Sequence, residues 1–191
     1  MKTTGKQSQN EPSRQKEKKF KLIQDCKRQI TLPRAFFAII IIISITLLGF
    51  RSNNPQQPAP DFILDDIHGN RVILSEYRGA IVLLEFMATW CPTCRKVTSE
   101  LLKINQNYNS KVVLISISVD PSYDSVARLT AFVEEYRISW SVCRDTEDVN
   151  LTYEIEVIPT HYLIDPHQYI NWRDTGWISS ETLNEQIAQL L

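Results

Sequence analysis

Two cysteines, Cys91 and Cys94, are separated by two residues, a spacing that serves either redox chemistry or metal binding. They follow an apolar run, Ala80–Ala88, that is typical of a strand buried on both faces. A helix that starts at this pair gives the first sulfur unpaired N–H groups and the positive end of the helix dipole, and both stabilise a thiolate. Pro92 suits the first turn of such a helix. We therefore predict that Cys91 attacks and that Cys94, on the same helix face, resolves the mixed disulfide.

Glu85 is an acid within this apolar strand, six positions before Cys91. An ionised carboxylate is costly to bury, so we expect its pKa to rise toward neutrality. A carboxyl group with that pKa can pass a proton to or from Cys94 during exchange. The alternative is that Glu85 pairs with a lysine at the rim of the sheet.

Other uses of the cysteine pair fit the sequence less well. A zinc site needs a second pair of ligands, and the chain has no other C-x-x-C and no H-x₃₋₅-H; a lone cysteine, Cys143, with a histidine is the remaining candidate. Copper delivery through His161 would need a C-x₃-C spacing, whereas this chain has C-x₂-C. A peroxidase would need P-x₃-T-x₂-C, whereas here Thr89 is one residue too close to Cys91 and the proline is absent. A purely structural disulfide in so small a loop gains little loop-closure stabilisation.

The segments around the pair predict an α/β domain with a central mixed sheet flanked by helices. Val97, Leu101, Ile104 and Tyr108 recur at helical spacing after the cysteines. The other expected elements are a hairpin over 61–66 and 70–74, strands over 111–119 and 140–143, helices over 127–136, 147–153 and 179–191, and a second hairpin over 160–165 and 168–174. We expect Cys143 to be a buried free cysteine, and Trp140, Trp172 and Trp177 to be packing residues.

The N-terminal region differs sharply in charge from this domain. Residues 1–34 carry ten Lys/Arg against three acids, a net of +7, whereas the remainder carries eleven against nineteen, a net of −8. Residues 35–50 form an uncharged apolar run, and residues 51–60 are rich in proline. We predict a basic cytoplasmic tail over 1–34, a transmembrane signal anchor over 35–50, a linker over 51–60 and a folded domain over 61–191 outside the cytoplasm. A cleaved signal peptide is the alternative.

The run EFMATWCPTC, from Glu85 to Cys94, resembles the active-site segment of the thioredoxin superfamily. The first hairpin and the anchor resemble its membrane-anchored TlpA/ResA-like branch, which is related to the AhpC/TSA redoxins. The resemblance covers about residues 59–191. It implies a thioredoxin-like fold and a thiol-disulfide oxidoreductase at the cell membrane, in several relatives one that serves cytochrome c maturation.

The same resemblance implies a role for the segment around Pro159. In this superfamily a cis-proline loop faces the cysteine pair, so we expect Pro159 to be cis and to lie against Cys91. Exposed backbone at Ile158 would then pair with an extended substrate segment. The other residues expected to contact the substrate are Trp90, Pro92, Thr93 and Thr160. Many ResA-like proteins carry a glutamate where this chain has Val97, which leaves Glu85 as the evident proton carrier.

The sequence therefore predicts an enzyme of thiol-disulfide exchange that acts on protein substrates through Cys91 and Cys94, in cytochrome c maturation or in disulfide reduction. It needs no small cofactor and no metal, but it needs a membrane or extracytoplasmic redox partner, because the pair does not turn over alone. Nucleic acid is not an expected partner. The competing hypothesis is a copper, metal or haem-assembly chaperone that binds through the same thiols.

Overall fold

The structure is a computed structural model that describes residues 57–108 and 111–191. The predicted tail, the predicted membrane anchor and residues 51–56 of the predicted linker lie outside the described residues. Within the described ranges, no helix is long and apolar enough to cross a membrane.

The described chain starts with a small two-stranded sheet, as the sequence predicted. Strands β1 (Ile63–Asp65) and β2 (Arg71–Ile73) pair antiparallel. The turn between them is held by the carboxylate of Asp66, which accepts hydrogen bonds from the backbone N–H groups of His68 and Asn70 at 2.8 Å each. A short 3₁₀ helix, η1 (Leu74–Tyr77), follows and was not predicted.

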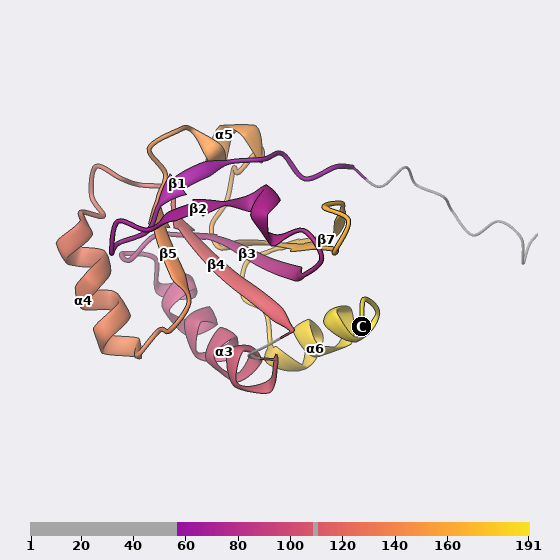
Figure 1. The fold of residues 1–191 in the computed structure, drawn as a ribbon. Helices are drawn as coiled ribbons and strands as arrows, with labels where there is room; N and C mark the ends of the chain where they lie inside the picture. Colours follow the sequence, from indigo (N-terminus) through magenta and orange to yellow (C-terminus); the bar gives the residue numbers. More distant parts are fainter. Residues whose placement is uncertain (1–56, 109–110) are drawn as a thin grey trace, which may run out of the picture. The chain divides into compact units, whose positions relative to one another are not determined.

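A five-stranded mixed sheet in the order β5-β4-β3-β6-β7 forms the centre of the domain (Figure 1). Strand β3 is central because it pairs in parallel with β4 and antiparallel with β6. All of its residues are buried, as its continuous apolar run predicted. The strands are β3 (Ile81–Met87), β4 (Val112–Ser118), β5 (Ser141–Arg144), β6 (Thr160–Ile164) and β7 (Ile170–Thr175).

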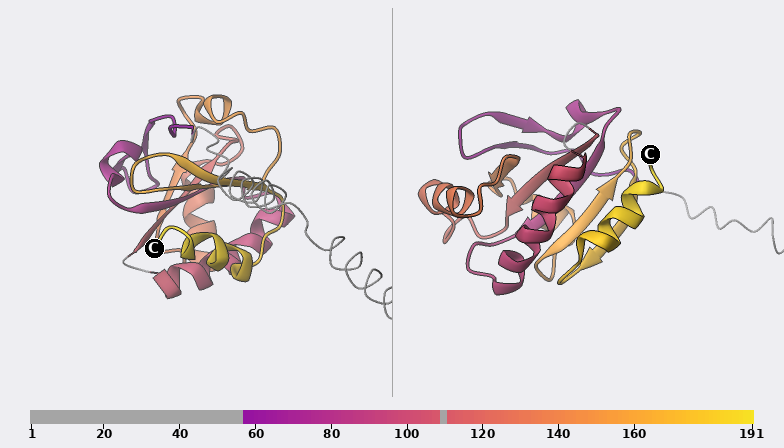
Figure 2. Two further views of the ribbon diagram at one scale, coloured as in Figure 1. Left: turned by 90° about the vertical axis from the view of Figure 1, so that its right-hand side faces the viewer. Right: turned by 90° about the horizontal axis from the view of Figure 1, so that it is seen from below.

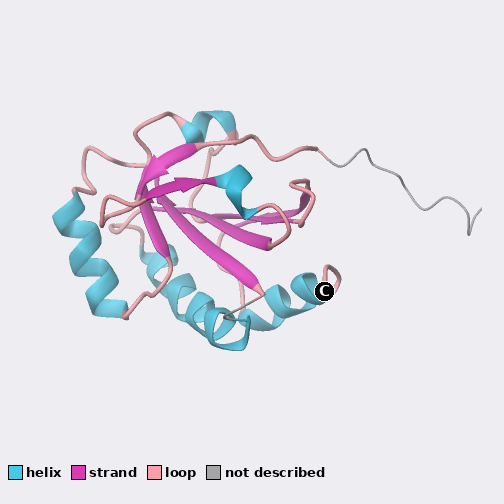
Figure 3. Cartoon of the chain, viewed as in Figure 1, coloured by secondary structure: helices cyan, strands magenta, loops and turns pink. Residues whose placement is uncertain are grey.

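Helices and the hairpin cover the two faces of this sheet (Figures 2 and 3). Helices α3 (Pro92–Tyr108) and α6 (Ser180–Ala188) lie on one face, where they share a core with alternate residues of β3 such as Leu83. The hairpin and α5 (Val149–Thr152) lie on the other face, where Phe86 belongs to a second core. Helix α4 (Val126–Tyr136) packs beside β5. Side chains of β3 therefore alternate between two separate packed layers.

The domain begins before residue 61. The backbone N–H of Ala59 donates to the carbonyl of Gln168 at 2.8 Å, and that of Ile170 donates to the carbonyl of Gln57 at 2.8 Å. Pro58 forms a bridge with Tyr169 between these bonds. The last residues of the predicted linker thus continue the edge of the sheet beside the β6–β7 turn.

The tryptophans and the third cysteine of the domain test the predicted packing. Trp140 and Trp172 are partly buried against the core on the α3 side, and Cys143 is a buried free cysteine, as expected. Burial raises the pKa of the Cys143 thiol to about 12, so it is inert as a nucleophile. Trp177 is 57% exposed, so the prediction that it packs in the core was wrong.

Candidate active site

The junction of β3 and α3 presents the cysteine pair. The backbone N–H of Cys91 donates to the carbonyl of Ala88 at 3.1 Å, and this tight turn leads directly to the start of α3 at Pro92. Cys91 and Cys94 form a disulfide, and the N–H of Cys94 points at the sulfur of Cys91 at 3.1 Å. Cys91 is 5% exposed and Cys94 is 0% exposed. Of the two, Cys91 is therefore the one whose sulfur a substrate thiolate can approach, and the roles of attacking and resolving cysteine stay predictions.

The turn before Cys91 is fixed by an acid that the sequence did not point to. Asp124 is fully buried, and its carboxylate accepts hydrogen bonds from the N–H of Thr89 at 2.9 Å and from the hydroxyl of Ser118 at 2.6 Å. The hydroxyl of Thr89 donates to the same carboxylate. Trp90, half exposed, donates from its indole N–H to Asp120 at 3.1 Å. These bonds hold the approach to the disulfide in place.

The segment around Pro159 lies against the disulfide, as the resemblance implied. The Ile158–Pro159 peptide bond is cis, and the carbonyl oxygen of Ile158 is 4.0 Å from the sulfur of Cys91. The carbonyl of Pro159 accepts a hydrogen bond from Gly176 at 2.7 Å. Thr160, expected to contact substrate, is instead fully buried, and its hydroxyl donates to the carbonyl of Val157 at 2.6 Å. Its side chain shapes the loop from within.

Glu85 is buried on the face of β3 that α3 covers. Its neighbours on that face are Leu83, which shares a core with Val97, and Met87, which shares one with Cys94. The carboxyl therefore lies beneath the first turns of α3. Burial raises the pKa of Glu85 to about 7, although a hydrogen bond from Ser116 at 2.7 Å acts in the opposite direction. No lysine pairs with Glu85 in the described part of the chain, so that alternative was wrong.

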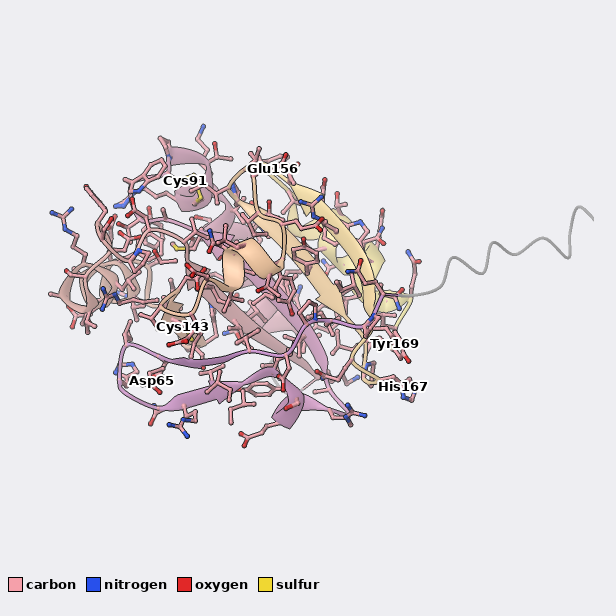
Figure 4. All side chains as sticks on the ribbon, turned by 90° about the horizontal axis from the view of Figure 1, so that it is seen from above. Asp65, Cys91, Cys143, Glu156, His167 and Tyr169 are labelled. Carbon is pink, nitrogen blue, oxygen red and sulfur yellow. A yellow bond between two sulfur atoms is a disulfide. The ribbon has the colours of Figure 1, made fainter. Side chains whose placement is uncertain are left out.

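Three exposed apolar side chains stand next in sequence to residues of the site; we call them the apolar rim and define it as Trp90, Val157 and Trp177, which are 50%, 57% and 57% exposed. Each is adjacent in sequence to a residue already placed at the site: Cys91, Ile158 or Gly176. Pro92 is exposed beside them, and Thr93 is half-buried. Figure 4 shows Cys91 and Glu156 at one end of the domain and His167 and Tyr169, from the β6–β7 turn, at another.

His161, the histidine considered for copper, lies inside the domain and not at the rim. It is 0% exposed, next to Glu85 on the neighbouring strand β6. Across residues 57–108 and 111–191, no three His, Cys, Asp or Glu side chains gather in a way that could hold a metal ion.

Comparison with known proteins places this geometry in a family. Residues 55–173 match the AhpC/TSA family. The chain is 32% identical over 170 residues to a thiol-disulfide oxidoreductase ResA of Bacillus cereus, covering 82% of this chain and 96% of that protein. It is 27% identical over 131 residues to the thioredoxin-like protein YneN of Bacillus subtilis (strain 168), covering 69% of this chain and 77% of that one. A solved thiol-disulfide oxidoreductase from Bacteroides fragilis NCTC 9343 superposes with a TM-score of 0.62 at 26% identity, covering 71% of this chain and 100% of that chain.

Proposed function

Because the chain belongs to the AhpC/TSA family and is a thioredoxin-like thiol-disulfide oxidoreductase, we propose that it exchanges disulfides with protein substrates outside the cytoplasm. Residues 35–50 hold it in the membrane as a single-pass anchor, with the N-terminus in the cytoplasm. The charge difference between residues 1–34 and the domain supports this orientation.

The observation that carries the proposal is the restricted approach to a single sulfur. Cys91 lies beside the backbone of Ile158, while Cys94 is sealed beneath it. The apolar rim around this opening suits the side chains of a polypeptide, and the free backbone of Ile158 suits pairing with an extended segment. A protein substrate uses both features, whereas a small thiol uses neither.

Exchange moves two electrons between the substrate and the disulfide. In the direction that reduces this domain, a substrate thiolate attacks the sulfur of Cys91, the Cys91–Cys94 bond breaks, and a mixed disulfide forms. The sulfur of Cys94 leaves with the electron pair and takes a proton from Glu85. The second substrate thiol then loses its proton to solvent and attacks the substrate sulfur of the mixed disulfide, so that Cys91 leaves as a thiolate. Oxidation of the domain is the reverse sequence.

We propose that the protein substrates belong to cytochrome c maturation. The similarity to ResA and the resemblance of the first hairpin to that branch support this choice. A second redox protein, in the membrane or outside it, must restore the pair after each turnover.

Trapping the mixed disulfide tests this proposal. In the full chain, Cys94→Ser removes the resolving thiol, so Cys91 should remain bonded to its substrate and a larger species should appear on non-reducing gels. The adduct should be absent from the matched control C91S/C94S and should be identified by mass spectrometry.

A different result would support the metal-chaperone hypothesis. If Cys94→Ser gives no adduct in cells, and the purified wild-type protein holds Cu(I) through Cys91 and Cys94, the exchange reaction is not the function. Bound Cu(I) should then be lost in the C91S/C94S control.

A further inference from the structure

Two ionisable residues lie directly opposite each other in the centre of the sheet. Glu85 of β3 and His161 of β6 are register partners in an antiparallel pair, so their side chains project to the same face. Glu85 is 2% exposed and His161 is 0% exposed. The Oε1 atom of Glu85 and both ring nitrogens of His161 have no hydrogen-bond partner among the described residues. Buried polar atoms are seldom left without a partner, and these belong to facing residues of two paired strands, where a carboxylate can accept an imidazole N–H.

The surroundings of the pair contain few other groups that titrate. Ser116 of β4 is the register partner of Glu85 on its other side and also accepts the indole N–H of Trp140 at 2.9 Å. Asp174 of β7 is the partner of His161 and is exposed. From α3, Cys94 and Thr98 are buried, and the hydroxyl of Thr98 donates to the carbonyl of Cys94 at 3.1 Å. The charged residues of the two covering helices are exposed or form ion pairs. On α3, Arg95 pairs with Glu135 of α4 and Lys103 pairs with Glu100, and Lys96 is exposed. On α6, Glu181 and Glu185 are exposed.

We propose that His161 is a positioning residue for thiol-disulfide exchange, which acts through Glu85 by donating an N–H to its carboxylate when the proton has moved to Cys94. This inference rests on the proposed function and adds a group to it. Without His161, Glu85 would at that moment be a buried anion with only the hydroxyl of Ser116 bonded to it, a costly state. The imidazole lies where it can offset that cost without itself reaching the sulfur.

The proton and electron balance is complete with the groups present. When a substrate thiolate opens the disulfide, the proton of Glu85 moves to the leaving sulfur of Cys94 and the charge moves to the carboxylate. The imidazole N–H of His161 hydrogen-bonds to that carboxylate and stays neutral. In the reverse direction, the Glu85 carboxylate removes the proton of Cys94. The resulting Cys94 thiolate attacks the mixed disulfide, and the hydrogen bond from His161 to Glu85 is released.

The protonation states at neutral pH agree with this scheme. Burial raises the pKa of Glu85 to about 7. Burial lowers the pKa of His161 to about 4, with the Asp174 carboxylate acting in the opposite direction. The imidazole is therefore neutral through the range in which Glu85 gains or loses its proton, so it acts as an N–H donor.

The test is the pH profile of the step in which Cys94 resolves a mixed disulfide, measured with the full chain between about pH 5 and pH 9. That rate rises as Glu85 becomes a carboxylate. His161→Leu removes the N–H group that stabilises the Glu85 carboxylate, so the inflection of the pH profile should move up by about one pH unit. At pH values below the inflection, the rate should then be about tenfold slower than in the wild type. His161→Gln keeps an N–H donor and should restore most of the rate.

A double-mutant cycle separates this role from a structural one. His161→Leu made in a Glu85→Gln background should leave the pH profile where Glu85→Gln alone puts it, because there is no carboxylate left to stabilise. If His161→Leu shifts the profile equally in both backgrounds, or in neither, the inference is overturned.

Nuclear magnetic resonance of the wild-type protein gives a readout that needs no folded variant. The chain has three histidines, and His68 and His167 are exposed. The ring ¹⁵N signals of His161 should shift with an inflection near the titration of Glu85 and lose that inflection in Glu85→Gln. Flat His161 signals in a protein that still exchanges disulfides would refute the pairing alone, whereas a protein with no exchange at all would refute the proposed function.

Discussion

Glu85 makes the stability of the domain depend on pH. Its pKa in the folded protein, about 7, is above its ordinary value of 4.5, so the folded state binds the proton more tightly than the unfolded state. The stability that protonated Glu85 contributes is therefore fully present below about pH 4.5 and is lost as pH rises through about 7. The cause is burial of the carboxylate, which is the cost to the fold of the proposed proton transfer to Cys94.

Glu85→Gln should therefore make the oxidised protein more stable at high pH. Gln cannot ionise and can still accept the hydroxyl of Ser116, so the gain at about pH 8 should be roughly 3 kcal/mol, with little change at pH 4.5. Urea unfolding at several pH values measures it.

The control for this prediction is Glu100→Gln on α3. The backbone N–H of Ser180 lowers the pKa of Glu100, so this substitution should cost stability at neutral pH and lose its effect as pH falls. A Glu85→Gln variant that is destabilised equally at both pH values would show that the carboxyl is not strained by burial.

At the scale of elements, the turn between β3 and α3 depends on a side chain from the segment after β4. Asp124 accepts three hydrogen bonds with its carboxylate, two of them from Thr89. The turn is therefore held by hydrogen bonds to the segment after β4 as well as by its own residues. Loss of these hydrogen bonds should make Trp90 and Cys91 more mobile together.

Asp124→Asn should destabilise the domain and slow exchange. The amide of asparagine places an N–H group against one of the donors from Thr89 or Ser118, so the free energy of unfolding should fall by about 1–3 kcal/mol. The rate of exchange at Cys91 should fall severalfold. Urea unfolding and stopped-flow exchange kinetics test the two effects.

Asp66→Asn is the matched control, because Asp66 holds the exposed hairpin turn with similar bonds. It should leave the exchange rate unchanged. Equal rates in wild type and Asp124→Asn would mean that the turn is rigid without Asp124.

The elements that the sequence predicted are those with local patterns. The apolar run of β3, the period of α3 and the hairpin turns are each readable within a few residues. Glu85 and Cys91 could be found because they lie only six positions apart along the chain. The place of His161 beside Glu85 could not be predicted, because it depends on strand register. The bond from Thr89 to Asp124 could not be predicted either, because it joins residues 35 positions apart. Trp177 could not be placed correctly because an exposed aromatic residue has the same composition signal as one that is packed.

At the scale of the whole molecule, the proposed topology rests on the charge asymmetry of the chain. The basic residues precede the predicted anchor, and the cysteine pair follows it. Under the proposed topology, this order puts the exchange reaction on the side of the membrane where disulfides persist.

A reporter fused after Leu191 tests the topology in a bacterial host. Alkaline phosphatase, which needs disulfides to fold, should be active there, and green fluorescent protein exported by the same route should be dark. The control is the same pair of fusions on a chain that lacks residues 35–50, which should give the opposite result. A fluorescent full-length fusion would place the domain in the cytoplasm.

The rim has a consequence for how such a protein can change over time. Trp90, Val157 and Trp177 come from three separate loops, and none of them belongs to the buried layer that contains Glu85 and Cys94. Under the proposed function, substitutions of Val157 and Trp177 should alter which polypeptide fits without altering proton transfer beneath the helix. Partner choice and chemistry could then change independently of each other.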